Sequence, residues 1–167
     1  MNNGGAKIMG IEIRLNQVED YVGLMEIENS VWNDENTPFV HVYENVIEYQ
    51  LRYPVGSMLV AVDGKEVLGL VNFNNPSPLA AHSETWLLGI GVASQAQGRG
   101  VGQKLLEALK AKAREEGIHK LSLRVMGTNL GAQRFYLRNG FEIEGNLKEE
   151  FKIGDKYVDD IFMGIIL

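Results

Sequence analysis

Residues 97–103 read Gln-Gly-Arg-Gly-Val-Gly-Gln, and this stretch decides how the middle of the chain folds. It lies between an apolar run that ends at Val92 and an amphipathic segment that begins at Val101. The first N–H groups of a helix have no partner within the helix, and the helix dipole favours anions there. Glycine has no Cβ, so the backbone can approach a bulky anion. The stretch therefore predicts a strand-to-helix turn that cradles a phosphate or pyrophosphate, with Arg99 as a charged contact.

Two better-known phosphate loops do not fit the same residues. A dinucleotide fingerprint, G-x-G-x-x-G, requires glycine at Gln103 when it is counted from Gly98, and at Leu105 when it is counted from Gly100. A P-loop requires Gly-Lys followed by Ser or Thr, which this stretch does not contain. The alternative that remains is a glycine-rich turn that only connects a strand to a helix.

Composition limits the class of protein. The chain has 167 residues, which corresponds to one domain, and we expect a flexible leader over residues 1–10 and a single domain over 11–167. With no cysteine, the chain has no disulfide, no cysteine-ligated metal and no thiolate nucleophile. No two histidines have metal-ligand spacing, so we expect no metal.

Charge and hydropathy limit the partners. The formal net charge is −6, which argues against broad nucleic-acid binding because such binding needs a basic surface. No apolar run reaches the roughly 18 residues that span a bilayer, and residues 1–10 lack the apolar core of a signal peptide. We therefore expect a cytoplasmic protein that binds neither nucleic acid nor membrane.

The periodicity of apolar residues predicts one α/β domain with a sheet of mixed strand direction. Asn16 is a candidate N-cap for the first helix, and Asp63-Gly64 is a strong signal for a two-residue hairpin turn. The expected elements are a strand over 11–15, helices over about 18–31 and 42–53, strands over 57–62, 66–73 and 85–92, a helix from 101 to Gly117, a strand over 121–125, a helix over 129–139, and strands over 141–151 and 157–167.

The glycine stretch also carries a family resemblance. Gln97, Gly100 and Gly102, placed after a strand, resemble the Q/R-x-x-G-x-G/A signature of the GNAT superfamily of N-acetyltransferases. Residues 135–141, Phe-Tyr-Leu-Arg-Asn-Gly-Phe, are similar to the family segment (F/L)-Y-x-x-x-G-F. The tail over 144–163 is similar to members that acetylate polyamines, amino acids or protein N-termini. The resemblance implies an α/β (α+β) domain: a mixed, largely antiparallel twisted sheet of about seven strands, with about four helices and two splayed parallel central strands.

The resemblance also implies a site for acetyl-CoA between the strands over 85–92 and 121–125. In the family, backbone groups of the first strand pair with the pantetheine arm, and one of their N–H groups polarises the thioester carbonyl. The loop after that strand holds the pyrophosphate, and an asparagine hydrogen-bonds the pantetheine. By position, the residues implied are Ile90, Gly91 and Val92 on the strand, Gln97, Gly98, Arg99, Gly100, Val101, Gly102 and Gln103 in the loop, and Asn129.

Two residues are candidates for proton transfer. Tyr136 matches the family tyrosine and can return a proton to the leaving thiolate as general acid; the alternative is an ordinary core tyrosine. The position of the family's usual glutamate falls near Trp86 here. Glu84, two residues earlier on the same face of an extended strand, is therefore the candidate general base. His82 and a chain of water to bulk solvent are its competitors.

These residues together predict an acetyl-CoA-dependent N-acetyltransferase. Because no cysteine can form an acyl intermediate, we expect direct transfer in a ternary complex to a primary amine, either a small molecule or a protein N-terminus. The alternative function is a non-catalytic, acyl-CoA-binding regulatory module. The family resemblance also suggests a possible homodimer. The acidic residues between 26 and 44, together with Trp32 and Tyr43, have two interpretations. They could line the entrance to a site for a cationic amine, or they could form an ordinary solvent-exposed helix face.

Overall fold

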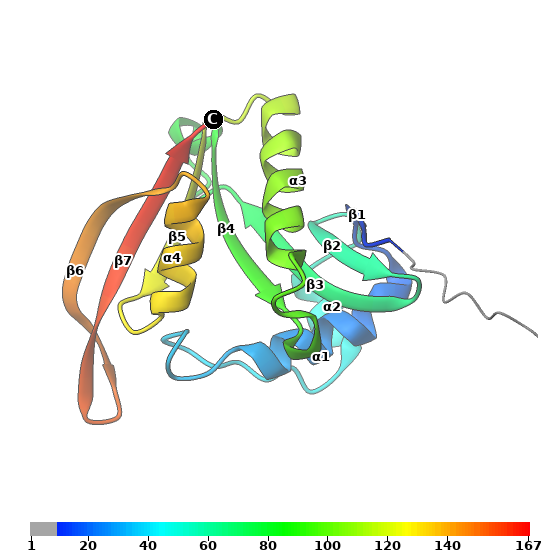
Figure 1. The fold of residues 1–167 in the computed structure, drawn as a ribbon, viewed down its shortest axis with the longest axis horizontal. Coiled ribbons are helices and arrows are strands. Elements are labelled where there is room, and N and C mark those ends of the chain that lie inside the picture. Colours follow the sequence, from blue (N-terminus) through cyan, green and yellow to red (C-terminus); the bar gives the residue numbers. More distant parts are fainter. Residues whose placement is uncertain (1–9) are drawn as a thin grey trace, which may run out of the picture.

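One twisted sheet of seven strands, in the order β1-β2-β3-β4-β5-β7-β6, is the framework of the molecule (Figure 1). The computed structural model describes residues 10–167, so the expected leader lies outside the described residues except for Gly10. The strands are β1 Glu12–Leu15, β2 Met58–Asp63, β3 Glu66–Asn74, β4 Thr85–Val92, β5 Lys120–Met126, β6 Glu142–Ile153 and β7 Lys156–Ile166. The helices are α1 Tyr21–Val31, α2 Val46–Arg52, α3 Val101–Glu115 and α4 Leu130–Arg138, with single 3-10 turns at Val18–Asp20, Ala80–His82 and Ser94–Ala96.

The sheet consists of two antiparallel halves joined by one short parallel contact. β1 to β4 form one half, and β5, β7 and β6 form the other. The contact pairs Thr85–Leu87 of β4 with Lys120–Ser122 of β5. Beyond Leu87, β4 continues along β3 while β5 continues along β7, so the two strands separate (Figure 1). The structure thus confirms the expected mixed sheet with two splayed parallel strands at its centre.

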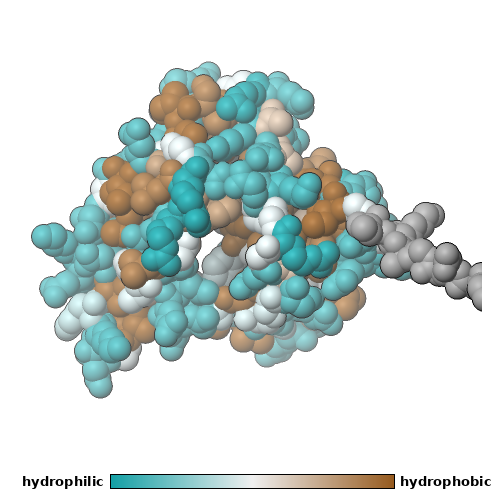
Figure 2. All heavy atoms as spheres, in the orientation of Figure 1, coloured by the Kyte–Doolittle hydropathy of each residue, from teal (hydrophilic) through white to brown (hydrophobic). Residues whose placement is uncertain are grey.

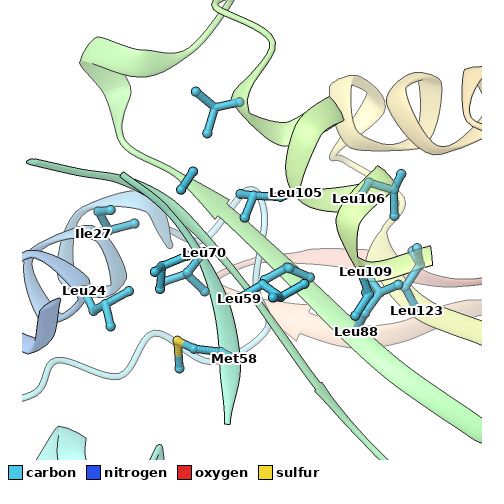
Figure 3. Close-up of a cluster of buried hydrophobic side chains, with 14 of the residues drawn as sticks. Leu24, Ile27, Met58, Leu59, Leu70, Leu88, Leu105, Leu106, Leu109 and Leu123 are labelled. Atoms are coloured by element: carbon cyan, nitrogen blue, oxygen red, sulfur yellow. The ribbon is translucent and has the colours of Figure 1, made fainter. Parts of the chain in front are cut away.

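Helices α3 and α1 close the core of the first half. The leucines at 105, 106 and 109 of α3 are fully buried and face the strands, while Leu24 and Ile27 of α1 are also buried in the same cluster (Figure 3). Gly69 of β3 allows α3 to approach closely, since a Cβ there would lie 3.0 Å from Val101 Cγ1. Within the described residues, no helix is long and apolar enough to cross a membrane.

The periodicity placed the elements in the right order, but three local expectations need correction. Asn16 does not cap a helix: it is buried, its Nδ2 donates to the Pro54 carbonyl and its Oδ1 accepts from the Met58 N–H. Helix α2 begins only at Val46, and Val42 lies before it with 60% of its surface exposed. The first hairpin turns one residue later than expected, at Gly64-Lys65, because Asp63 pairs with Glu66.

We predict that Leu105→Ala lowers the free energy of unfolding by about 2–5 kcal/mol, because it removes buried methyl groups and leaves a cavity between α3 and the sheet. The matched control is Leu51→Ala on α2, where the side chain is 80% exposed and we expect a change within about 0.5 kcal/mol. Urea denaturation measures both variants. Equal losses would contradict the assignment of the core.

Candidate functional site

A continuous cleft opens where β4 and β5 separate. Its inner part, which we call the central pocket, has a volume of 460 Å³. Its outer part, the loop pocket, has 540 Å³ and shares five lining residues with the central pocket. In Figure 2 this face is hollowed near its centre, between the α3 side and the α4 side. The central pocket is lined by Val31, Trp32, Asn36, Ile90, Gly91, Val92, Gln97, Gly98, Gly102, Asn129, Gly131, Ala132, Phe135 and Tyr136.

The backbone of β4 offers hydrogen-bonding groups to this cleft. Successive residues of a strand direct their N–H and C=O groups to opposite edges. The Trp86 carbonyl faces β5, where it accepts from the Ser122 hydroxyl at 3.3 Å. By alternation, Ile90 and Val92 face the gap, whereas Ala93 faces β3, where its N–H donates to the Leu68 carbonyl at 2.9 Å. The gap-facing edge at Ile90 is therefore free to pair with an extended ligand.

The loop before α3 supplies a set of unused N–H groups. Gly98 and Gly100 have φ of 75° and 78°, a backbone conformation that L side chains rarely adopt, and a Cβ on either would point into open space. None of the hydrogen bonds among the described residues uses the N–H of Gly98, Gly100, or the first three residues of α3, Val101 to Gln103. Converging donors at a helix N-terminus fit an anion such as a pyrophosphate.

The positive charge at the cleft comes from an arginine that the sequence did not single out. Arg138, near the C-terminal end of α4, lines the loop pocket. Arg99 lies in the loop, but its guanidinium is directed toward the β2–β3 turn, with Nη2 3.6 Å from Asp63 Oδ2, and it does not line the cleft.

Asn129 and the α1–α2 segment shape the inner end. The Asn129 Oδ1 caps α4 by accepting from the Ala132 N–H at 3.1 Å, which turns its amide toward the central pocket. Trp32 and Asn36 line the opposite wall. The sequence offered Trp32 as a possible lining residue for an amine, whereas Asn36 was missed because its segment has no periodicity. The segment is held in place by Thr128, whose hydroxyl donates to the Glu35 carbonyl at 2.8 Å.

Tyr136 reaches the central pocket from α4. Its ring packs edge-on against Phe135 and Phe141, with centroids 5.2 and 5.4 Å away, and only 7% of the residue is exposed. Burial raises the pKa of its hydroxyl well above the usual value. The hydroxyl therefore stays protonated through the neutral and mildly basic range, as a general acid must.

Glu84 is not brought to the cleft, and the expectation that it is the general base needs correction. It precedes β4 at the end where β4 and β5 are still paired, and its carbonyl accepts from the N–H groups of His119 and Lys120. Ile90 is six residues away along an extended strand, or about 20 Å at 3.3 Å per residue. His82 lies on the same far side, with Nδ1 2.7 Å from the Ser77 hydroxyl. Within the described part of the chain, the lining of the central pocket contains no carboxylate.

The acidic residues near the N-terminus divide into two kinds. Four of them, at positions 26, 34, 35 and 44, are exposed, as expected for residues of an ordinary solvent-exposed surface. Glu28 is buried and lines a separate pocket beside Trp32.

Comparison with known proteins agrees with this geometry. Residues 21–141 match the sequence model of the acetyltransferase (GNAT) family. An L-methionine sulfoximine/L-methionine sulfone acetyltransferase of Pseudomonas aeruginosa is 29% identical over 171 residues, covering 95% of this chain and 96% of its own. Among solved structures, the smu.2055 protein of Streptococcus mutans has a TM-score of 0.85 at 23% identity, over 93% of this chain and 98% of its own. A phosphinothricin acetyltransferase of Sinorhizobium meliloti, in complex with acetyl-CoA, has a TM-score of 0.84 at 22% identity, over 95% and 89%.

We predict that Gly100→Val removes most of the thermal stabilisation that acetyl-CoA gives the wild type, because the side chain projects into the anion site. The matched control is Gly56→Val, which has a similar φ of 79° and open space around it but lies far along the chain from the loop. Both variants bear the same backbone strain of about 1–2 kcal/mol. Thermal melts with and without millimolar acetyl-CoA separate strain from binding, and an undiminished shift in Gly100→Val would refute the site.

Proposed function

This chain belongs to the acetyltransferase (GNAT) family, and we propose that the cleft between β4 and β5 is its acetyl-CoA site. The protein is accordingly an acetyl-CoA-dependent N-acetyltransferase. Two sets of free backbone groups support this placement, because they open on the same cleft. They are the edge of β4 at Ile90 and the unused N–H groups of the glycine loop.

The two parts of the cleft suit the two parts of the co-substrate. The edge of β4 at Ile90 would pair with the amides of the pantetheine arm, as an added strand pairs with a sheet edge. The N–H groups of Gly98, Gly100 and the first turn of α3 would hold the pyrophosphate, with Arg138 as the nearby cation. Acetyl-CoA supplies an acetyl group activated as a thioester.

The chain's own residues supply orientation and one proton. In this proposal, a gap-facing N–H of β4 would polarise the thioester carbonyl. Tyr136 holds a proton at its hydroxyl and donates it to the leaving sulfur, because its raised pKa keeps it protonated. The proton of the attacking amine passes to solvent, since the central pocket offers no carboxylate among its described lining residues.

The acceptor is proposed to be the amine of a small molecule. The relative that matches nearly the whole chain is named for acting on L-methionine sulfoximine and L-methionine sulfone. The wall of the cleft opposite α4 is formed by the segment between α1 and α2, with Trp32 and Asn36, and in this proposal that segment would select the acceptor.

We predict that Tyr136→Phe lowers kcat by about 100-fold with little change in KM for acetyl-CoA, because only the proton donor is removed. Tyr157→Phe is the control, since Tyr157 is exposed on β7. Thiol release under conditions where chemistry limits the rate measures both. An unchanged kcat in Tyr136→Phe would exclude the acid role.

We also predict that Arg138→Ala weakens acetyl-CoA binding about 3- to 10-fold, with a smaller effect at high salt, because one charge-assisted contact to phosphate is lost. Arg134→Ala is the control: it lies on the same helix, is exposed and lines neither pocket. Isothermal titration at low and high salt gives the affinities. Equal losses in the two variants would point to general attraction by surface charge instead.

A further inference from the structure

Lys110 connects the two helices that flank the loop pocket. It lies on α3, and its Nζ donates to the backbone carbonyl of Asn139, the C-cap of α4, at 2.7 Å. The same ammonium lies 5.6 Å from the centre of the Phe141 ring. Among the described residues, no other side-chain hydrogen bond joins α3 to α4 or to its C-cap. Within this part of the chain, one polar contact thus ties the two helices together.

The sheet joins its two halves only over a short distance. Thr85–Leu87 pair with Lys120–Ser122, and beyond them β4 and β5 separate. Helix α3 is packed on the strands of the first half, whereas α4 lies on the side of β5 and β7 (Figure 1). The strands share no ladder along the open part of the cleft. Contacts between the helices must therefore set how far apart the two walls of the cleft stand.

The bridge made by Lys110 lies just outside the loop pocket. Gly102 and Gln103 of α3 line one side of this pocket, and Arg138 and Asn139 line the other. Lys110 is not among the lining residues. It follows Gln103 by seven residues, which places it two turns further along the same face of the helix, or about 10 Å away at 1.5 Å per residue. The lysine thus holds a lining residue, Asn139, without lining the pocket itself.

A lysine at this position carries a cost. The side chain is half-buried, and burial lowers the pKa of its ammonium, as does the charge of Arg114. The hydrogen bond offsets part of that cost, because the Asn139 carbonyl lies at the negative end of the α4 dipole. Methionine has a flexible apolar stem and no charge to bury. We therefore expect Lys110→Met to fold.

We propose that Lys110 is a positioning residue for acetyl-CoA: it holds the C-terminal end of α4 against α3 and so keeps the two sides of the loop pocket at the spacing that a pyrophosphate needs. The proposal rests on the proposed function, because it takes the loop pocket as the pyrophosphate site. Lys110 acts through Asn139 and the neighbouring Arg138. Neither of these lines the central pocket, so the effect is confined to the pyrophosphate end of the donor.

The first experiment compares two donors in Lys110→Met. S-Acetylpantetheine carries the same thioester and arm as acetyl-CoA but lacks the pyrophosphate. We expect the Kd of acetyl-CoA to rise about 5- to 10-fold and that of S-acetylpantetheine to stay within about twofold, because only the pyrophosphate contacts depend on the spacing of the helices. Isothermal titration gives the first value, and displacement of bound CoA gives the second. Lys110→Arg keeps a charged donor and should restore most of the affinity.

Lys112→Met is the matched control, because it removes a lysine from the same helix. Lys112 pairs with Glu116 and lies 6.0 Å from the ring centre of Phe73 on β3, so its contacts stay within the first half of the structure. We expect it to leave both dissociation constants unchanged, even if it lowers the melting temperature. This separates loss of the bridge from a general loss of stability.

A second experiment measures the spacing of the helices and needs no catalysis. The chain has no cysteine, so spin labels can be attached through Ala111→Cys on α3 and Arg134→Cys on α4, both at exposed positions. Pulsed dipolar spectroscopy then reports the distribution of distances between the labels. We expect a narrow distribution with Lys110 intact and a broader one in Lys110→Met. Acetyl-CoA should narrow the broader distribution.

Three outcomes would overturn the proposal. These are an unchanged Kd of acetyl-CoA in Lys110→Met, equal losses of affinity for the two donors, and a distance distribution that does not respond to the substitution. Failure of the proposed function looks different, because the wild type would then bind neither donor, and the labelled pair would still test the bridge. If Lys110→Met does not fold, Lys110→Gln takes its place, since it is polar, uncharged and one atom shorter.

Discussion

The interruption of pairing between β4 and β5 is the constraint on which the rest of the structure depends. A parallel pair normally satisfies the backbone groups of both strands along their whole shared length. Here only Thr85–Leu87 and Lys120–Ser122 pair, because each strand then follows its antiparallel neighbour in a different direction. The backbone groups beyond that point lie at the wall of a pocket, where a ligand with amide groups can complete what the sheet leaves open.

The helices position the remaining groups around that opening. Helix α3 is packed on the sheet through Leu105 and Leu109, and this fixes its N-terminus at the mouth of the cleft. Helix α4 brings Tyr136 and Arg138 from the second half of the sheet to the same opening, one to each pocket. The α1–α2 segment closes the third side with Trp32. The lining of the cleft thus comes from both halves of the sheet and from the segment between α1 and α2.

Sequence reasoning succeeded where the signal is local and failed where it is not. The glycine loop was predictable because left-handed backbone at Gly98 and Gly100 and the start of α3 are properties of neighbouring residues. Asn16 was misread because its partners are 38 and 42 residues away. Glu84 was misplaced because tertiary pairing decides which end of β4 opens. Glu28 was one acidic residue among several, and only packing of the aperiodic segment after α1 distinguishes it.

If main-chain groups recognise acetyl-CoA as proposed, this has a consequence for how such a protein changes over evolutionary time. The N–H groups at Ile90 and along the loop persist through almost any substitution, provided that the glycines and the course of the strand are kept. Side chains elsewhere in the sheet are then free to change, which fits solved structures that share this fold at 22% or 23% identity. The segment after α1, in contrast, contributes side chains such as Trp32 and Asn36 to the lining of the central pocket. A few replacements there could redirect the enzyme to a new amine without disturbing the donor site.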